Sequence, residues 1–473
     1  MIRLTNCGEK NVTVLFCHGN SDKMEGFSEA AKQLFQGELL QTAWTTDKEG
    51  KLVLLTGMGE PGLEVIRLKE LGAAAVKECR AKKITDFSMN IEEVIKEYGV
   101  DAVRHITEGA VLGTYEQRNF KEKQEEEALD IELCGISEGD FEEAQKLFQE
   151  TLTVTEGICF ARNMVNLPGN RLRPEDFAKS IMEFVKDTGI ETELLDVNTL
   201  KEKGMQGLLG VGESSEFPPC LLVLRYTGNP EDSRKTGLVG KGVTCDTGGY
   251  CLKPANSMLG IKGDMAGGAA VSGAIYSLAK NKVPVNAVAV IPMCENRISP
   301  GSLLPGDVIG SYAGKTIEVA NTDAEGRLIL ADAVSYAVRD EGVTEVLDIA
   351  TLTGAVVGMF GFTVTGAVCD NDEMYQRFEK AHTYAGERCS RIPFYAEHEK
   401  MIESKIADVR NLSSDGCGTI TAGLFIRAFA EERPWLHLDI AGTAWVDAPI
   451  FAFQSAGATG AGVYSIYRFC CEK

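Results

Sequence analysis

Hydrophobic and polar positions along the first third of the chain alternate between strand-like and helix-like patterns. The apolar runs at 11–17 and 51–56 have the length of buried strands, whereas the stretches 26–35 and 63–78 carry apolar residues at helical spacing. Strands that alternate with helices are typical of α/β domains. We therefore predict an N-terminal α/β domain over residues 1–140.

A longer amphipathic pattern predicts a helix at 141–165 that connects this domain to the rest of the chain. The charged run at 121–127 that precedes it is expected to form a solvated face. A chain of 473 residues is too long for a single hydrophobic core. We expect an α/β fold of two domains, each a mixed sheet flanked by helices, with the functional domain at 166–473.

The densest group of chemically active residues lies at 321–328, which read Asn-Thr-Asp-Ala-Glu-Gly-Arg-Leu. The pattern predicts a strand at 316–320 and a helix at 328–338, so this group lies on the loop between them. Open α/β sheets place their ligands at such loops. Asp323 and Glu325 are two positions apart and would project to the same side of an extended backbone. Because divalent cations prefer grouped oxygen ligands, the segment predicts a metal site.

A second group of candidate ligands lies upstream. An apolar strand that begins at Leu238 ends in glycines, which allow the backbone to approach a ligand closely, and Asp246 lies at its exit. Lys253 follows, and a glycine-rich segment then leads into a helix of small residues that runs to about residue 280. Asp264 stands near the N-terminus of this helix.

Taken together, these segments resemble the cytosol (leucine) aminopeptidase family, whose members are two-metal exopeptidases. The octapeptide at 321–328 is the most specific of the shared motifs. The others recur in the family's order over most of the chain, at 166–170, 173–178, 294–296, 305–308, 348–355, 421–423 and 437–444.

The resemblance implies a metal site built from both groups of residues. One ion would be held by Lys241, Asp246, Asp264 and Glu325, and the other by Asp246, Asp323 and Glu325. Lys241 would bind as a neutral amine, because two nearby cations and burial both lower the pKa of a lysine. Manganese, zinc, magnesium and cobalt all suit a site of carboxylates and amine.

The resemblance also implies a mechanism. In the family, a water that bridges the metals attacks the scissile carbonyl, and the free α-amine of the substrate binds one metal. Lys253 would donate a hydrogen bond to the oxyanion, and Arg327 would hold a bicarbonate that transfers the proton, because neither side chain is a good base at neutral pH. Arg327 could instead be a structural partner for the acidic loop.

The specificity pocket is implied in the same way, and a preference for leucine or methionine is expected from it. Its lining would comprise Ile261, Thr351, Gly354, Ala441 and Ala444. The chain departs from the family near this site. Cys245 replaces an aromatic residue, Thr247 a serine and Ile261 a frequent methionine, and the loop 413–418 lacks an arginine often found there. These differences bear on the packing behind Asp246 and on the mouth of the site.

Patterns that point to other functions are weaker. Residues 57–62 match the dinucleotide motif G-x-G-x-x-G, but Glu60 would repel a pyrophosphate, so we interpret the segment as a turn. The five histidines show no metal-ligating spacing. A two-metal phosphoesterase would need phosphate-binding basic residues, and the site offers only Lys253 and Arg327. A catalytically silent binding subunit that retains the fold is the other alternative.

Composition narrows the class of protein further. A net charge of −21 disfavours general binding to nucleic acid. The 14 cysteines are scattered without a C-x-x-C motif, which is typical of a reducing compartment. The first residues lack a signal-peptide pattern, and no apolar stretch has the length of a membrane span. We expect a soluble cytoplasmic enzyme, and the resemblance implies a homohexamer that acts on peptides with a free N-terminus.

Overall fold

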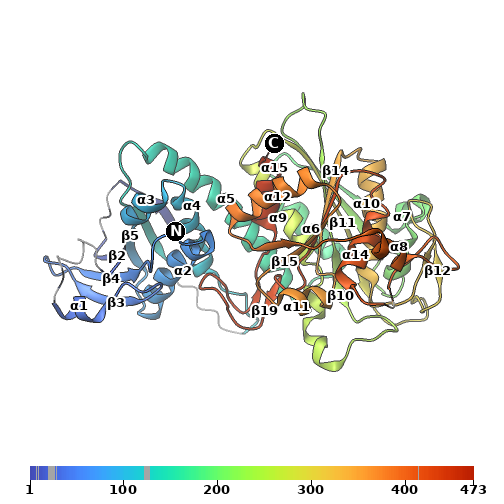
Figure 1. The fold of residues 1–473 in the computed structure, drawn as a ribbon, viewed down its shortest axis with the longest axis horizontal. Helices are drawn as coiled ribbons and strands as arrows, with labels where there is room; N and C mark the ends of the chain where they lie inside the picture. Colours follow the sequence, from blue (N-terminus) through green and yellow to red (C-terminus); the bar gives the residue numbers. More distant parts are fainter. Residues whose placement is uncertain are drawn as a thin grey trace. The chain divides into compact units, whose positions relative to one another are not determined.

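The computed structural model describes residues 1–6, 8, 10–19, 27, 29–121, 128–413 and 415–472. The described residues divide into two compact units. Unit 1 comprises Met1–Thr155 with Ala448–Ala456, and unit 2 comprises Glu156–Asp447 with Gly457–Lys473. Each unit has its own sheet flanked by helices, as the sequence predicts (Figure 1). None of the described helices is both long and apolar enough to cross a membrane.

The sheet of unit 1 has the strand order β1-β6-β5-β2-β4-β3. Its strands are parallel except β3, which pairs antiparallel with β4. The strands are β1 (Ile2–Leu4), β2 (Val12–Cys17), β3 (Thr42–Thr46), β4 (Leu52–Gly57), β5 (Asp86–Asn90) and β6 (Asp130–Cys134). The helices are α1 (Glu29–Leu34), α2 (Val65–Ala81), α3 (Glu92–Tyr98) and α4 (Ala102–Thr114).

Helices α2 and α4 approach each other closely because glycines line their contact. A Cβ on Gly72 would lie 2.3 Å from the carbonyl oxygen of Ile106, and one on Gly109 would lie 1.9 Å from that of Lys69. The strands predicted at 11–17 and 51–56 and the helix predicted at 63–78 are confirmed as β2, β4 and α2. The helix predicted at 26–35 is observed as α1, and Gly26 and residues 122–127 of the charged run lie outside the described residues.

Unit 2 contains a mixed sheet of order β16-β15-β18-β14-β9-β11-β8-β7, with β10 paired to β11. Strands β9, β10, β11, β14 and β18 run parallel, so their carboxyl ends share one edge, whereas β8 and β15 pair antiparallel with β11 and β18. Its strands are β7 (Glu191–Leu195), β8 (Cys220–Thr227), β9 (Thr236–Gly240), β10 (Gly242–Asp246), β11 (Asn286–Asn296), β14 (Glu345–Ala350), β15 (Thr365–Cys369), β16 (Cys389–Arg391) and β18 (Trp435–Asp439).

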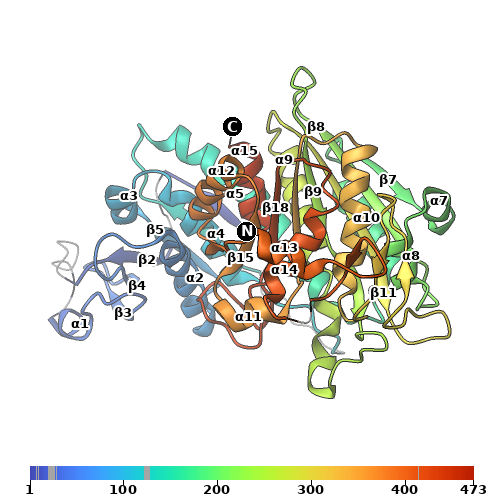
Figure 2. The ribbon, with the colours of Figure 1, turned by 45° about the vertical axis from the view of Figure 1, so that its right-hand side comes forward.

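Short strands pair outside this sheet, and helices cover its faces (Figure 2). The short strands are β12 (Val308–Ile309), β13 (Ile317–Glu318), β17 (Val409–Arg410), β19 (Trp445–Val446) and β20 (Gly457–Ala458). Helix α5 (Phe141–Asn166) begins in unit 1 and ends in unit 2. The other helices of unit 2 are α6 (Pro174–Val185), α7 (Val197–Lys203), α8 (Gln206–Gly212), α9 (Ala266–Lys280), α10 (Glu325–Arg339), α11 (Gly354–Phe360), α12 (Asp372–Ala385), α13 (Ala396–Glu399), α14 (Gly418–Arg427) and α15 (Val463–Cys471), with 3-10 helices η2 (Ala255–Gly263) and η3 (Lys400–Ile402).

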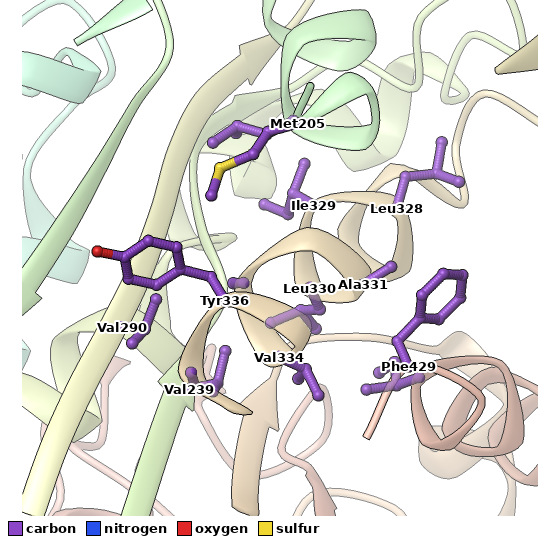
Figure 3. Close-up of a cluster of buried hydrophobic side chains, with 14 of the residues drawn as sticks. Met205, Val239, Val290, Leu328, Ile329, Leu330, Ala331, Val334, Tyr336 and Phe429 are labelled. Atoms are coloured by element: carbon purple, nitrogen blue, oxygen red, sulfur yellow. The ribbon is translucent and has the colours of Figure 1, made fainter. Parts of the chain in front are cut away.

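Helix α10 carries the central part of the hydrophobic core of unit 2. Leu328, Ile329 and Leu330 are fully buried on it, and each such side chain contributes roughly 1.5–3 kcal/mol through burial. The surrounding side chains come from several elements, and Figure 3 labels Met205, Val239, Val290, Val334, Tyr336 and Phe429 among them. This packing fixes the first turn of α10, which begins at Glu325.

The structure corrects the predicted geometry of the 321–328 segment. The strand expected at 316–320 is only the two-residue β13, and the helix expected to begin at residue 328 begins at Glu325. Asp323 therefore lies in a turn and Glu325 in the first turn of a helix. The expectation that the two acids project from one side of an extended backbone is wrong, because the helix starts earlier than its apolar pattern indicates.

Candidate metal centre

Four carboxylates from separate segments of unit 2 approach one another at the carboxyl edge of its sheet. Asp246 ends β10, Asp264 lies between η2 and α9, Asp323 precedes α10, and Glu325 begins it. Asp246, Asp323 and Glu325 each offer an oxygen, and these oxygens lie within 4.8 Å of one another. The two candidate groups of the sequence thus converge on one place.

Lys241, between β9 and β10, lies at the centre of this group. Its Nζ is 2.8 Å from Asp264 Oδ2 and 2.8 Å from Glu325 Oε1, and it donates to the carbonyl oxygen of Thr351 over 3.0 Å. Burial alone would lower the pKa of Lys241, but the Asp264, Glu325 and Asp246 carboxylates raise it above its ordinary value. As an ammonium, Lys241 offsets part of the negative charge of these carboxylates. To bind a metal ion, it would have to lose a proton and bind as a neutral amine.

Asp246 is held from both sides. Its Oδ1 accepts hydrogen bonds from the Gly248 amide and from Asn296 Nδ2, each over 2.9 Å. Its Oδ2 lies 2.8 Å from Lys253 Nζ, which also pairs with Asp323. Lys253 therefore bridges two of the carboxylates from the side of the cavity.

The charges of the site fit divalent cations. Four carboxylates, those of Asp246, Asp264, Asp323 and Glu325, face the ammonium groups of Lys241 and Lys253, which leaves an excess of negative charge. Burial raises the pKa of Asp264, Asp323 and Glu325 above their ordinary values, and Asp246 raises each further.

The hydrogen bonds of the carboxylates also favour a site for divalent cations. Within the described residues, Asp264 Oδ2 and Glu325 Oε1 are buried and make no hydrogen bond, although both lie at ion-pair distance from Lys241. Such oxygens are suited to coordinating an ion. The donor set of carboxylates and one amine fits manganese, magnesium, cobalt or zinc with oxygen-rich coordination, in contrast to a tetrahedral sulfur and imidazole site.

Arg327 lies two positions after Glu325 in helix α10 and is almost fully buried. Its Nη1 donates to the carbonyl oxygen of Asn411 over 2.8 Å, and its Nε has no hydrogen-bond partner among the described residues. Burial lowers the pKa of Arg327 to about 10, so the guanidinium stays charged at neutral pH. The residues that line the cavity do not include Arg327.

Asn411 is a supporting residue that the sequence analysis missed. Its Oδ1 accepts from the Ala320 amide over 2.7 Å, and its Nδ2 donates to the Asn321 carbonyl over 2.7 Å. It thereby holds the turn that carries Asp323. Asn411 follows the two-residue strand β17, far along the chain from this turn, and no motif of the sequence marks it.

A cavity of about 350 Å³ opens beside the carboxylates. Lys241, Asp246, Asp264, Asp323 and Lys253 line it on one side. The residues expected to form the specificity pocket line it too, namely Ile261, Thr351, Gly354, Ala441 and Ala444. The rest of the lining was not predicted and consists of Ser257, Gly260, Gly263, Leu352, Thr353 and Trp445. The structure thus brings the predicted pocket residues and the predicted ligands except Glu325 to one cavity, and their roles remain predictions.

Cys245 and Cys251 flank Asp246 in the sequence, and both are free thiols in the structure. Cys245 is buried, and burial raises the pKa of its thiol. Cys251 is half-buried, and its amide donates to Thr322 Oγ1 over 2.8 Å. Neither cysteine belongs to the group of acids whose oxygens converge among the described residues.

Substitution of Gly326 by alanine tests how tightly Lys241 is held. A Cβ at this position would lie 2.6 Å from both Cε and Nζ of Lys241, so the lysine or the first turn of α10 would have to move. We expect Gly326→Ala to weaken manganese binding by about 10- to 100-fold, as the loss of groups that orient ligands does. Isothermal titration calorimetry measures the manganese affinity of the variant. Gly358→Ala is the matched control, because its Cβ on helix α11 would meet nothing within 4 Å; equal affinities in both variants would contradict the prediction.

Comparison with known proteins identifies the family to which this chain belongs. The family model described as "Cytosol aminopeptidase family, catalytic domain" matches residues 159–467, and the model of the N-terminal domain of the same family matches residues 30–124. A probable cytosol aminopeptidase of Clostridium perfringens is 39% identical over 442 residues, which are 92% of this chain and 90% of that protein. One of Treponema denticola is 39% identical over 447 residues, 93% of each chain.

A solved structure is similar over nearly its whole length. The bottromycin maturation enzyme BotP in complex with Mn superposes with a TM-score of 0.89 at 30% sequence identity. The match covers 98% of this chain and 99% of that structure.

Proposed function

Because the chain belongs to the cytosol aminopeptidase family, we propose that it uses two metal ions to release N-terminal amino acids, preferably leucine and other medium apolar residues, from peptides. Family membership makes it a metal-dependent aminopeptidase; the paired ions and the substrate preference are the further step. The observation that carries the proposal is the approach of the Asp246, Asp323 and Glu325 oxygens to within 4.8 Å of one another.

The residues of the site divide between two ion positions. Lys241, Asp246, Asp264 and Glu325 would hold one ion, and Asp246, Asp323 and Glu325 the other. When bound, two divalent ions supply Lewis acidity toward a carbonyl and lower the pKa of a water. The manganese complex of BotP supports manganese as one of the ions that such a site accepts.

Lys253 is placed to act on the reacting carbonyl. It lines the cavity beside Asp246 and Asp323. Burial lowers the pKa of Lys253, but the neighbouring Asp246 and Glu325 raise it above its ordinary value, so the side chain is an ammonium at neutral pH. An ammonium at this place would donate a hydrogen bond to the oxyanion that forms when the amide is attacked.

Arg327 would bind a small anion that accepts the proton. Its Nε–H is buried and has no hydrogen-bond partner among the described residues, and its guanidinium is charged. A planar guanidinium with a free donor suits a planar anion such as bicarbonate. This anion would act as the base that neither Lys253 nor Arg327 can be at neutral pH.

We extend the proposal to a homohexamer that acts on peptides with a free N-terminus. Large apolar side chains are exposed in unit 2, including Leu252, Leu259, Met359 and Phe362. Contiguous patches of exposed apolar side chains are typical of an interface between subunits, and these side chains would contribute to one. Sedimentation velocity tests this assembly, and a monomer at micromolar concentration would contradict it.

A panel of aminoacyl p-nitroanilides with manganese tests the proposed activity. The apolar side chains of Ile261, Ala441 and Ala444 face the cavity, whose excess charge is negative. We expect leucine and methionine to give a higher kcat/KM than alanine by about 10- to 200-fold, the usual effect of filling an apolar pocket. Chelation should abolish turnover. Aspartate or lysine at the top of the ranking would contradict the preference, and turnover of p-nitrophenyl phosphate alone would favour a phosphoesterase.

A further inference from the structure

Two loops form most of the pocket wall that faces the metal ligands. Residues 351–354 follow β14, and residues 440–445 follow the neighbouring strand β18. Together they contribute Thr351, Leu352, Thr353, Gly354, Ala441, Ala444 and Trp445 to the cavity. The distance between these loops sets the width of the pocket.

Both loops are tied to one carboxylate behind the wall, that of Asp439. Its Oδ1 accepts from the amides of Leu352 and Thr353 over 3.2 and 3.4 Å, and from the amide of Ala441 over 3.2 Å. Its Oδ2 accepts from Thr353 Oγ1 over 2.6 Å. Asp439 is fully buried at the end of β18 and is not part of the cavity lining.

The loop that Asp439 holds also reaches the metal ligands. The carbonyl oxygen of Thr351 accepts from Lys241 Nζ over 3.0 Å, and Thr351 Oγ1 donates to Asp264 Oδ1 over 2.8 Å. On its other side, Thr353 caps helix α11 by accepting from the Val356 amide over 3.2 Å. A shift of residues 351–353 would therefore move the pocket wall. A larger shift would also disturb the contacts of Thr351 with Lys241 and Asp264.

A carboxylate in a fully buried position is costly unless each oxygen is hydrogen-bonded. Burial raises the pKa of Asp439, and His437 and the donors of residues 352, 353 and 441 lower it again. His437 itself is buried and pairs with Asp348 over 2.5 Å. The hydrogen bonds of Asp439 come from the two pocket loops, so this buried acid holds the two loops in place relative to each other.

We propose that Asp439 is a positioning residue for substrate selection, whose carboxylate fixes the spacing of the loops 351–354 and 440–445 and thereby the width of the pocket for the first side chain of the substrate. This inference rests on the proposed aminopeptidase function. Asp439 does not line the cavity, and its hydrogen bonds come from the loops, so it positions them rather than contacting the substrate. Its charge also acts on the buried Arg327, whose pKa burial lowers and the Glu325 and Asp439 carboxylates raise.

Hydrolysis of leucyl and alanyl p-nitroanilide by the full-length, manganese-loaded enzyme tests the proposal. We expect Asp439→Ala to lower the ratio of kcat/KM for leucine over alanine by about tenfold, because loosened walls no longer fit the larger side chain. The manganese content should stay at the wild-type value. Asp439→Asn should restore most of the ratio, since an amide keeps the acceptor for the three backbone amides and can donate to Thr353 Oγ1.

A second pair of variants keeps the test decisive if Asp439→Ala does not fold. Thr353→Val removes the hydroxyl that binds Asp439, caps α11 and also pairs with Thr419 Oγ1 over 2.9 Å. It should lower the ratio in the same direction, whereas Thr353→Ser should retain it. Asp348→Asn is the control, because this buried acid of the adjacent strand binds Trp435 and His437 and no pocket loop.

The possible results distinguish a failure of the role proposed for Asp439 from a failure of the proposed aminopeptidase function. An unchanged leucine-over-alanine ratio in both Asp439→Ala and Thr353→Val, or an equal loss in Asp348→Asn, would overturn the assignment of Asp439 while leaving the aminopeptidase function intact. A wild-type enzyme that hydrolyses neither anilide would instead refute the proposed function itself. Loss of manganese together with selectivity in Asp439→Asn would also overturn the proposal, because it would place the residue in the support of the metal site.

Discussion

Glu325→Gln is expected to remove both bound ions and nearly all turnover. Glu325 would be shared by the two ion positions, is almost fully buried, and is the first residue of helix α10. The amide has the same shape but lacks the charge, and its NH2 group cannot coordinate a cation. Because the loss of an outer partner alone costs about 10- to 100-fold in metal affinity, the loss of a bridging carboxylate should exceed that for each ion, and kcat should fall by at least about a thousandfold.

Metal content after gel filtration, measured by atomic emission, and kcat with leucyl p-nitroanilide give the result directly. Asp332→Asn is the matched control on the same helix. Asp332 is also fully buried, and burial raises its pKa to about 7. Its oxygens accept hydrogen bonds from the amides of Leu208 and Tyr312, away from the metal ligands. This control should keep its metals and its turnover. Two bound ions in folded Glu325→Gln would contradict the assignment of a bridging ligand.

Lys253→Ala is expected to lose turnover and keep its metals. The ammonium of Lys253 lies 2.8 Å from Asp246 Oδ2 and also pairs with Asp323, so its removal leaves more negative charge for the cations. Metal affinity should therefore not fall. Loss of one oxyanion donor costs about 2.7–4 kcal/mol of transition-state stabilisation, which is about 10²- to 10³-fold in kcat.

The effects of the Lys253 substitution on kcat and KM test whether Lys253 stabilises the oxyanion. An interaction made only in the transition state lowers kcat and kcat/KM equally, so KM should change little in Lys253→Ala. Lys253→Arg keeps the charge and should recover part of the rate. A wild-type kcat in Lys253→Ala, or a rise in KM at constant kcat, would show that Lys253 does not stabilise the oxyanion.

The sequence motifs located the candidate site, but the folded chain supplies its geometry. Asp323 and Glu325 could be predicted as a pair of ligands because they stand two positions apart in a specific motif, yet they do not project from an extended strand as predicted. They meet through a turn and a helix start. The apolar pattern of α10 begins only at Leu328, and a helix whose first turn carries ligands has no hydrophobic periodicity there.

The supporting roles of Asn411 and Asp439 could not be derived from the sequence, although Asp439 lies within the shared motif at 437–444. Asn411 holds the turn at Asn321 from 90 positions away, and Asp439 holds the loop at Leu352 from 87 positions away. Asn411 directly follows the two-residue strand β17, and Asp439 is the last residue of β18. Local patterns assign such polar residues to the surface or to loops. Their function comes from strand pairing between distant segments, such as β14 with β18, which periodicity alone does not specify.

Anomalous diffraction from crystals of the manganese-loaded protein tests the central claim most directly. The account predicts two anomalous peaks in each chain that share Asp246 and Glu325 as ligands, one also bound by Lys241 and Asp264 and the other by Asp323. A single peak, or peaks away from Glu325, would contradict it.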